Sequence, residues 1–187
     1  MSALLKGRRI AILATDGVEG IELTEPRRAL EEVGATVELL APQAGSIQSM
    51  DHQEKRESLP VDRRVSEADP GDYDGLVLPG GVMNADKLRV DPDAVRFTRA
   101  ILDSGTPVGV ICHGAWILIE TGLIRGRILT SYPTLRTDLQ NAGARWVDEE
   151  VRSDNGLVSS RRPADLPAFN SKIIEEFAEG LHLRKTV

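Results

Sequence analysis

The chain has 187 residues, of which 29 are acidic and 23 are basic, so its formal net charge is −6 at pH 7. A length only slightly above a typical domain of ~150 residues predicts a single domain over residues 1–187. The negative charge argues against nucleic acid or an anionic membrane as the main partner. Hydrophobic residues make up 41% of the chain and charged residues 28%, which is typical of a soluble globular protein.

Cysteine and histidine are scarce, because the chain has one cysteine and three histidines. An intrachain disulfide is impossible, and the scattered histidines argue against a structural zinc site. No dinucleotide or Walker motif follows a predicted strand, so we expect neither a metal nor a cofactor. The sequence has no apolar stretch of the ~20 residues that a membrane span needs, and no secretory signal. We therefore expect a cytoplasmic protein without a membrane partner.

Predicted strands and helices alternate from the start of the chain. Residues 10–13 form an apolar run that predicts a buried strand, and residues 21–33 predict a helix that ends before Gly34. Residues 36–41 predict the next strand, and a helix between two strands makes them parallel. Residues 51–72 are rich in charge and predict a solvated excursion.

The same alternation continues to the end of the chain. We expect strands at residues 76–78, 107–111 and 128–131, and helices at 91–103, 115–119 and 133–141. We also expect an edge hairpin around residues 59–65 and a second hairpin that turns at Asn155-Gly156. A final helix should begin after Pro163 and carry Leu181 and His182. These elements predict an α/β fold, with a doubly wound, mainly parallel sheet sandwiched by helices.

Ligands of open parallel sheets bind outside the carboxyl ends of the strands. One strand ends at Cys112-His113-Gly114, an abrupt strand-to-helix junction of the kind called a nucleophile elbow. The start of the following helix would favour the thiolate and lower the pKa of Cys112. A buried, inert cysteine is the competing interpretation, and a reactive one is favoured only about two to one.

The neighbouring residues carry weaker signals. His113 is as easily a packing residue as a catalytic one, and Glu19 lies at another strand exit, where surface acids are common. A protonated carboxyl brought against Cys112 could donate a hydrogen bond to the thiolate. Gly80 and Gly81 are turn residues whose N–H groups could form part of an oxyanion hole.

The chain resembles the ThiJ/PfpI superfamily, and within it the PfpI-type intracellular proteases and general stress proteins. The resemblance spans most of residues 9–169. It rests on several blocks in the right order: Glu19-Gly-Ile-Glu-Leu23, Leu76-Val-Leu-Pro-Gly-Gly81, Ile111-Cys-His-Gly114, Thr130-Ser-Tyr-Pro133, Asn141-Ala-Gly-Ala-Arg-Trp-Val-Asp148 and Val158-Ser-Ser-Arg161. It implies a flavodoxin-like fold that is also similar to the class I glutamine amidotransferases.

The resemblance also implies roles for individual residues. Cys112 would be the nucleophile, Glu19 the protonated glutamate that contacts the thiol, and His113 its partner. The acid beside His113 would come from a neighbouring subunit, with Asp86 as the nearest match, so a homodimer or larger homo-oligomer is implied. Tyr132 would line the substrate pocket, where Trp116 replaces the glutamine more usual in the family.

Amidotransfer itself is not expected. The only histidine downstream of the elbow is His182, and no acid follows it two positions later as in the amidotransferases.

The sequence is compatible with two functions. The first is a cysteine-dependent hydrolase-like stress protein, acting as a peptidase or as a deglycase or glyoxalase on 2-oxoaldehydes or their adducts. The second is a non-enzymatic redox sensor that uses oxidation of Cys112.

Overall fold

The computed structural model describes residues 3–182. Its strands are β1 (Arg9–Leu13), β2 (Val18–Glu19), β3 (Thr36–Ala41), β4 (Ser46–Asp51), β5 (Glu54–Pro60), β6 (Arg63–Arg64), β7 (Gly75–Leu78), β8 (Val108–Ile111), β9 (Ile128–Leu129), β10 (Arg145–Trp146), β11 (Val151–Asp154) and β12 (Leu157–Ser160). Its α-helices are α1 (Gly20–Glu32), α2 (Val82–Val90), α3 (Pro92–Ser104), α4 (Trp116–Thr121), α5 (Arg136–Asn141) and α6 (Leu166–Glu179).

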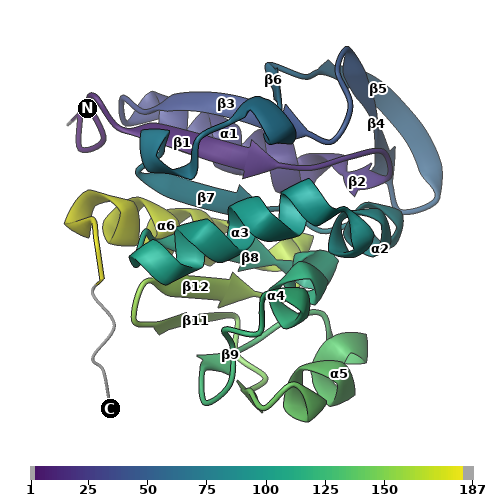
Figure 1. Ribbon diagram of the computed structural model, residues 1–187, viewed down its shortest axis with the longest axis vertical. Coiled ribbons are helices and arrows are strands. Elements are labelled where there is room, and N and C mark those ends of the chain that lie inside the picture. The colour runs from purple at the N-terminus through teal and green to yellow at the C-terminus, as the bar shows by residue number, and fades with distance from the viewer. Residues whose placement is uncertain (1–2, 183–187) are drawn as a thin grey trace.

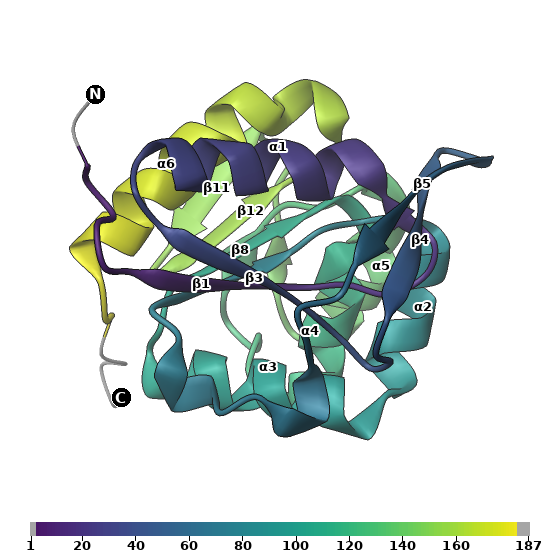
Figure 2. The ribbon, with the colours of Figure 1, turned by 90° about the horizontal axis from the view of Figure 1, so that it is seen from above.

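Seven strands form the central sheet, in the order β11-β12-β8-β7-β1-β3-β6. Every neighbouring pair is parallel except β11 with β12 at one edge. Helices α1 and α6 cover one face, and α3 and α4 cover the other (Figure 2). The predicted doubly wound, mainly parallel α/β sandwich is confirmed.

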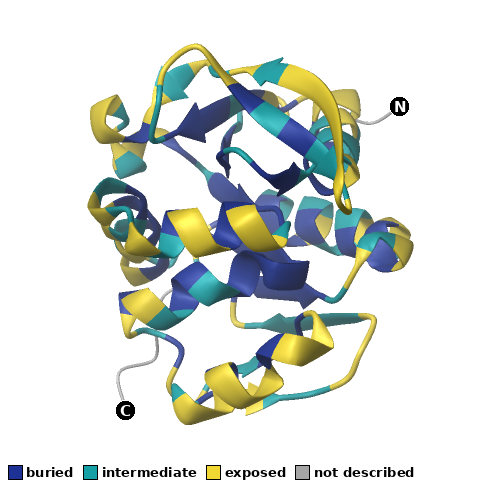
Figure 3. Ribbon diagram, turned by 90° about the vertical axis from the view of Figure 1, so that its right-hand side faces the viewer, coloured by how far each residue is buried: buried dark blue, intermediate teal, exposed yellow. Residues whose placement is uncertain are grey.

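Burial on both faces explains the continuous apolar runs of the central strands, because a parallel sheet is covered by helices on each side. Strands β7, β8 and β12 are buried throughout. On one face, Phe169, Ile173 and Phe177 of α6 belong to a core with Ile12 of β1. On the other, Phe97 of α3 lies in a second core. Figure 3 shows the contrast between these buried strands and the exposed outer hairpin strand β5.

Helix α3 illustrates how local sequence signals fix an element. The Asp91 side chain caps its start by accepting a hydrogen bond from the Ala94 N–H at 2.8 Å, and Pro92 occupies the first turn. The helix ends at Gly105, whose φ of 81° lies in the left-handed region. The observed helix agrees with the one expected over residues 91–103.

Three predictions of local structure need correction. The hairpin consists of β4 and β5 and does not lie at residues 59–65, because the chain turns at His52, which has a φ of 57°. Helix α6 ends at Glu179, so Leu181 and His182 lie beyond it. Helix α2 was not predicted, because its Val82, Met83 and Val90 are exposed and obscure the apolar pattern.

The carboxyl ends of β1, β7 and β8 lie side by side at one edge of the sheet, since these strands are parallel neighbours (Figure 1). The segments after β7 and β8 carry the turn at Pro79–Gly81 and the elbow at Cys112. Within residues 3–182, no helix combines the length and the apolar character needed to cross a bilayer.

Candidate active site

Cys112 follows β8 directly and begins a short 3-10 turn, Cys112–Ala115, that leads into α4. Its φ of 61° lies in the left-handed region, which costs a non-glycine residue roughly 1–3 kcal/mol. Gly114 permits this sharp bend, because a Cβ there would lie 2.5 Å from the Leu78 carbonyl oxygen. The structure therefore has the strained elbow that the sequence predicts.

Glu22, in the first turn of α1, supplies the carboxyl beside the thiol. Its side chain is fully buried, and Oε2 accepts a hydrogen bond from the Gly80 N–H at 2.9 Å. The carboxyl also interacts with the Cys112 side chain. Glu22 Oε1 is buried and makes no hydrogen bond to any described residue. A protonated Oε1 would have a donor to offer to a thiolate.

Gly80 allows this close approach. A Cβ at position 80 would lie 2.3 Å from Glu22 Oε2 and 3.0 Å from Cys112 Sγ, so no larger residue fits there. The Gly80 N–H is already bonded to Glu22, which makes it unavailable for the expected oxyanion role. The Asn84 side chain fixes the turn by donating to the carbonyls of Pro79 and Gly80 at 3.1 and 3.0 Å.

Burial raises the pKa of Glu22 to about 8, and the negative charge of Glu19 adds to this shift. The Gly80 N–H acts in the opposite direction but does not offset burial. Glu22 is therefore largely protonated at neutral pH, so it can donate a hydrogen bond to a thiolate at Cys112.

The Cys112 thiol has a raised pKa, in contrast to the lowered value expected from the helix start. Burial is the main cause, and the carboxylate form of Glu22 adds to it. The N–H groups of Gly81 and His113 point at the sulfur and lower the pKa in part. Once Glu22 is protonated its charge no longer opposes the thiolate, and three donors surround the sulfur.

His113 connects the thiol to the rest of the site. Its Nδ1 lies 3.2 Å from Cys112 Sγ, and its Nε2 lies 3.3 Å from Thr134 Oγ1. The imidazole stacks on the Tyr132 ring at 4.7 Å between centroids and meets Trp116 edge-on at 5.6 Å. Burial lowers the pKa of His113, so the ring is neutral near pH 7 and can accept a proton.

Trp116 is held in place from two sides. Its indole N–H donates to Asp138 Oδ2 at 2.9 Å, and the Arg89 guanidinium lies over the ring at 5.4 Å. Tyr132, by contrast, is exposed apart from its contact with His113. The two aromatic residues expected around the pocket thus both border the imidazole.

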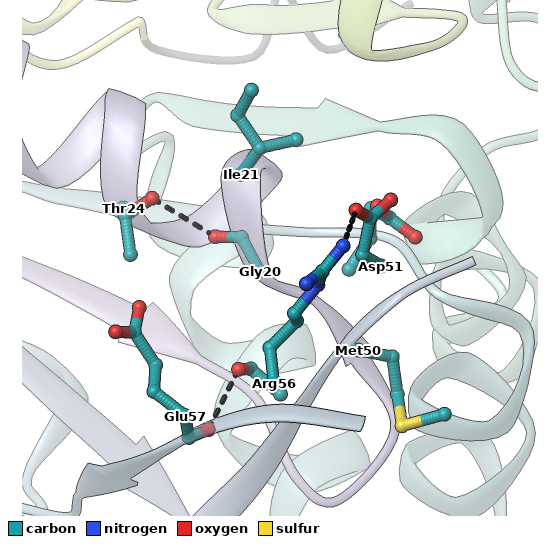
Figure 4. Close-up of a pocket in the computed structure, with 9 residues that line it drawn as sticks. Gly20, Ile21, Thr24, Met50, Asp51, Arg56 and Glu57 are labelled. Atoms are coloured by element: carbon teal, nitrogen blue, oxygen red, sulfur yellow. Dashed lines mark hydrogen bonds and ion pairs between the residues drawn. The ribbon is translucent and has the colours of Figure 1, made fainter. Parts of the chain in front are cut away.

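Glu19 lies elsewhere, and its predicted contact with the thiol is wrong. It is the N-cap residue of α1, and its Oε2 accepts a hydrogen bond from the His52 N–H at 3.0 Å. There it lines a cavity of about 340 Å³ between α1 and the β4–β5 hairpin, which also contains Arg56 bonded to Asp51 (Figure 4). Cys112 and His113 do not line this cavity.

Asp86 is exposed on α2, and among residues 3–182 no hydrogen bond or ion pair joins it to His113. The resemblance assigned that acid to a neighbouring subunit, so its role stays a prediction. Within the chain, the Thr134 hydroxyl takes the place beside His113 Nε2.

Two residues of the site, Glu22 and Thr134, were not predicted from the sequence. Glu22 had a usable signal, because it precedes Pro26 by four residues and Leu30 by eight and so shares the buried face of α1. Thr134 had none, since its position depends on how the segment after β9 folds over the elbow.

Comparison with known proteins identifies the family of the chain. The model of the DJ-1/PfpI family matches residues 8–176. The chain belongs to this family. It is 41% identical over 163 residues to a Bacillus subtilis protein named "Putative cysteine protease YraA", with 87% of this chain and 94% of the relative covered. It is 40% identical over 168 residues to "Protein/nucleic acid deglycase 2" of Escherichia coli, with 89% and 96% covered.

The solved structures show the same fold. A two-domain protein from Anabaena variabilis with DJ-1/ThiJ/PfpI-like and ferritin-like domains superposes with a TM-score of 0.85 at 34% identity. The alignment covers 90% of this chain and 47% of that protein, so this chain spans about half of its length.

Proposed function

We propose that the chain is a cysteine-dependent enzyme that converts 2-oxoaldehydes, free or as adducts with amines, into 2-hydroxy acids. The names of two relatives, a cysteine protease and a deglycase, support an enzymatic role for the chain. The observation that carries the proposal is the contact of Cys112 with a protonated Glu22 on one side and a neutral His113 on the other.

The first step is addition of the thiol to the aldehyde. The Sγ proton passes to His113 Nδ1, a C–S bond forms, and the π electrons of the C=O bond move to oxygen. The imidazolium returns the proton to that oxygen, which gives a hemithioacetal. With a hemiaminal formed from the aldehyde and an amine, the Sγ proton again passes to His113, a C–S bond forms and the C–N bond breaks. The imidazolium gives its proton to the departing nitrogen, which yields the free amine and the same hemithioacetal.

The second step is an internal redox exchange. His113 removes the carbon-bound proton, the electron pair forms an enediol, and return of the proton to the neighbouring carbon gives a thioester of the 2-hydroxy acid. The aldehyde carbon is oxidised and the ketone carbon reduced, so no external oxidant is needed. Water then cleaves the thioester and releases the thiol and the acid.

Burial favours a small carbonyl substrate over a peptide. Cys112 and His113 are 7% and 8% exposed, so only a compact electrophile reaches the sulfur of the single chain. Peptide hydrolysis would also need room for an extended chain on either side of the scissile bond. The peptidase interpretation therefore becomes an outcome of the test.

A homo-oligomer that shares the site is part of the proposal. Val82 and Met83, close to Asp86 on α2, are 53% and 49% exposed, and apolar side chains of this size favour coverage by another protein surface. A partner subunit bound there would bring its Asp86 towards a neighbouring site.

A redox role for Cys112 is the second candidate. Glu22 Oε1 has no hydrogen-bond partner among the described residues. An oxygen atom added to the Cys112 sulfur could accept a hydrogen bond from this carboxyl group. Exposure to mild peroxide, followed by mass spectrometry, would detect the addition of two oxygen atoms to Cys112. Such oxidation without turnover of any carbonyl or peptide would support the sensor over the enzyme.

The deciding experiment follows formation of the 2-hydroxy acid from methylglyoxal by the wild type, Cys112→Ser and Glu19→Gln. We expect turnover in the wild type, loss to background in Cys112→Ser and a near-normal rate in the matched control Glu19→Gln. Equal turnover by Cys112→Ser would refute the proposal, and cleavage of peptides with no acid formation would favour the peptidase.

A further inference from the structure

A second group of ionisable side chains lies at the far end of α6. Glu176 and Glu179 stand in its last turns, and His182 follows the helix end. His182 Nε2 is 3.1 Å from Glu176 Oε2 and 3.9 Å from Glu179 Oε2, and all three ligand atoms lie within 4.8 Å of one another. Neither the elbow nor its histidine belongs to this group.

Two atoms of the group are buried without a hydrogen bond. Glu176 is 5% exposed, and both Glu176 Oε2 and His182 Nε2 lack a hydrogen-bond partner within the part of the chain that the structure describes. They face each other at 3.1 Å, but the geometry of a hydrogen bond between them is not met. Leaving such groups unsatisfied is costly, and a bound cation would satisfy both.

The other oxygen of Glu176 is already engaged. Glu176 Oε1 accepts a hydrogen bond from the Ser153 hydroxyl of β11 at 2.5 Å and lies 3.6 Å from Lys172 Nζ. These contacts orient the carboxylate so that Oε2 points at His182. Outer partners of this kind are what position the ligands of a metal site.

His182 is also fixed in place. Its backbone N–H donates to the Gly105 carbonyl at 2.8 Å. Its ring packs on the turn between β11 and β12, where a Cβ on Gly156 would lie 2.8 Å from His182 Cδ2. A ligand atom held by the backbone and by packing loses little freedom when it binds an ion.

We propose that Glu176 Oε2, Glu179 Oε2 and His182 Nε2 bind Zn²⁺, with water as the fourth ligand. Zinc takes carboxylate oxygen and imidazole nitrogen at about 2.0–2.2 Å, so the ligand atoms of a tetrahedral site lie about 3.3 Å apart. The 3.1 Å separation already suits this geometry. The Glu179 side chain, 57% exposed, is free to close the 3.9 Å separation.

The ion would join three parts of the chain that are otherwise held by weaker contacts: the end of α6, the residues after it, and, through Ser153, the edge strand β11. The three ligands come together only in the folded chain, so zinc would bind the folded state in preference to the unfolded one. Zinc binding would therefore raise the stability of the protein. Scarce cysteine and histidine argued against a zinc site from the sequence, whereas two of the three ligands proposed here are carboxylates.

The chain offers a matched control in a second cluster of two carboxylates and a histidine: Glu19, Asp51 and His52. There Asp51 Oδ2 is 2.6 Å from Arg56 and Oδ1 is 2.9 Å from His52 Nδ1, so both oxygens are partnered. His52 and Asp51 are also largely exposed. We expect no zinc site at this cluster.

Titration of the full chain with ZnCl₂ by calorimetry tests the proposal, in a Cys112→Ser background so that the thiol does not compete. We expect one ion per chain and a higher midpoint of thermal unfolding with zinc. His182→Ala and Glu179→Gln should each weaken binding by at least about tenfold, since even outer partners of zinc ligands contribute 10–100-fold. His52→Ala should leave binding unchanged.

Because Glu179 is exposed, Glu179→Gln keeps the test valid even where His182→Ala fails to fold. The proposal would be overturned if Cys112→Ser failed to bind zinc at micromolar concentration, or if Glu179→Gln and His52→Ala bound zinc equally well. The cluster would then be only an ion pair of His182 with Glu176. The background is inactive under the proposed function, so neither result depends on catalysis.

Discussion

Glu22 and Cys112 interact across the space that Gly80 leaves open, although they come from α1 and from the end of β8. The contact joins a carboxyl whose pKa is raised to about 8 to a thiol that is buried beside it. A protonated carboxyl stabilises a thiolate by donating a hydrogen bond, whereas an ionised one repels it. The chemistry of the site therefore depends on the proton of Glu22.

The stability of the protein should respond to this proton. Between the unfolded pKa of 4.5 and the folded value of about 8, the native state keeps a proton that the unfolded state has lost. The free energy of unfolding should then fall as pH rises through this range, by up to about 1 kcal/mol per pH unit. Below pH 4.5 both states are protonated and Glu22 contributes no pH dependence.

Urea denaturation at several pH values checks this expectation. Glu22→Gln removes the titration, so the stability of this variant relative to the wild type should increase across the same range. A constant difference from pH 4.5 to about 8 would show that Glu22 is ionised in the folded state.

Gly80→Ala should destabilise the protein and disturb the thiol. The added Cβ would lie 2.3 Å from Glu22 Oε2 and 2.6 Å from Cys112 Cβ, and overpacking of this kind costs about 1–3 kcal/mol. Gly71→Ala is a suitable control, because its Cβ meets only Asp69 Oδ1 at 3.3 Å. Equal midpoints of urea denaturation for the two variants would contradict the packing around Gly80.

Thr134→Val should lower kcat/KM for methylglyoxal about fivefold, the equivalent of one lost hydrogen bond of about 1 kcal/mol. The Thr134 hydroxyl lies 3.3 Å from His113 Nε2 and would accept its proton, which leaves Nδ1 free to act on the thiol. Thr134→Ser should restore the rate, and a shifted pH–rate profile would mark a positioning role. If Thr134→Val kept the wild-type kcat/KM, a group other than Thr134 would have to fix the tautomer of the His113 imidazole.

Sharing of the site between subunits gives a complementation test. Asp86→Ala and Cys112→Ser should each be inactive or nearly so, while mixed oligomers should regain part of the activity because one site then contains an intact Cys112 and an intact partner Asp86. Full activity of Asp86→Ala alone would refute the assignment of this acid. So would mixed oligomers that form without any recovery.

The fold was largely predictable because its signals are local. Apolar runs mark the buried strands β1, β7 and β8, and the Asp91-Pro92 pair marks the start of α3. Helix α2 was missed because its apolar residues Val82, Met83 and Val90 are exposed. The apolar residues of this segment therefore do not mark one buried face of a helix.

The site was predictable in part, for a different reason. Cys112 and His113 are set by the abrupt end of one strand, which the sequence displays. The choice between Glu19 and Glu22 depends on which residue faces inward on α1, and therefore on where the helix begins. Contacts such as that of Thr134 with His113 arise only when distant segments pack together.

The pH dependence of Cys112 alkylation by iodoacetamide, in the wild type and in Glu22→Gln, tests the Glu22–Cys112 pair most directly. Glutamine keeps a donor beside the sulfur but carries no charge at any pH. We expect similar rates below about pH 8, the pKa of Glu22, and a faster reaction of Glu22→Gln above it, where the wild-type carboxylate opposes the thiolate. Superimposable profiles for the two proteins up to about pH 10 would contradict the account.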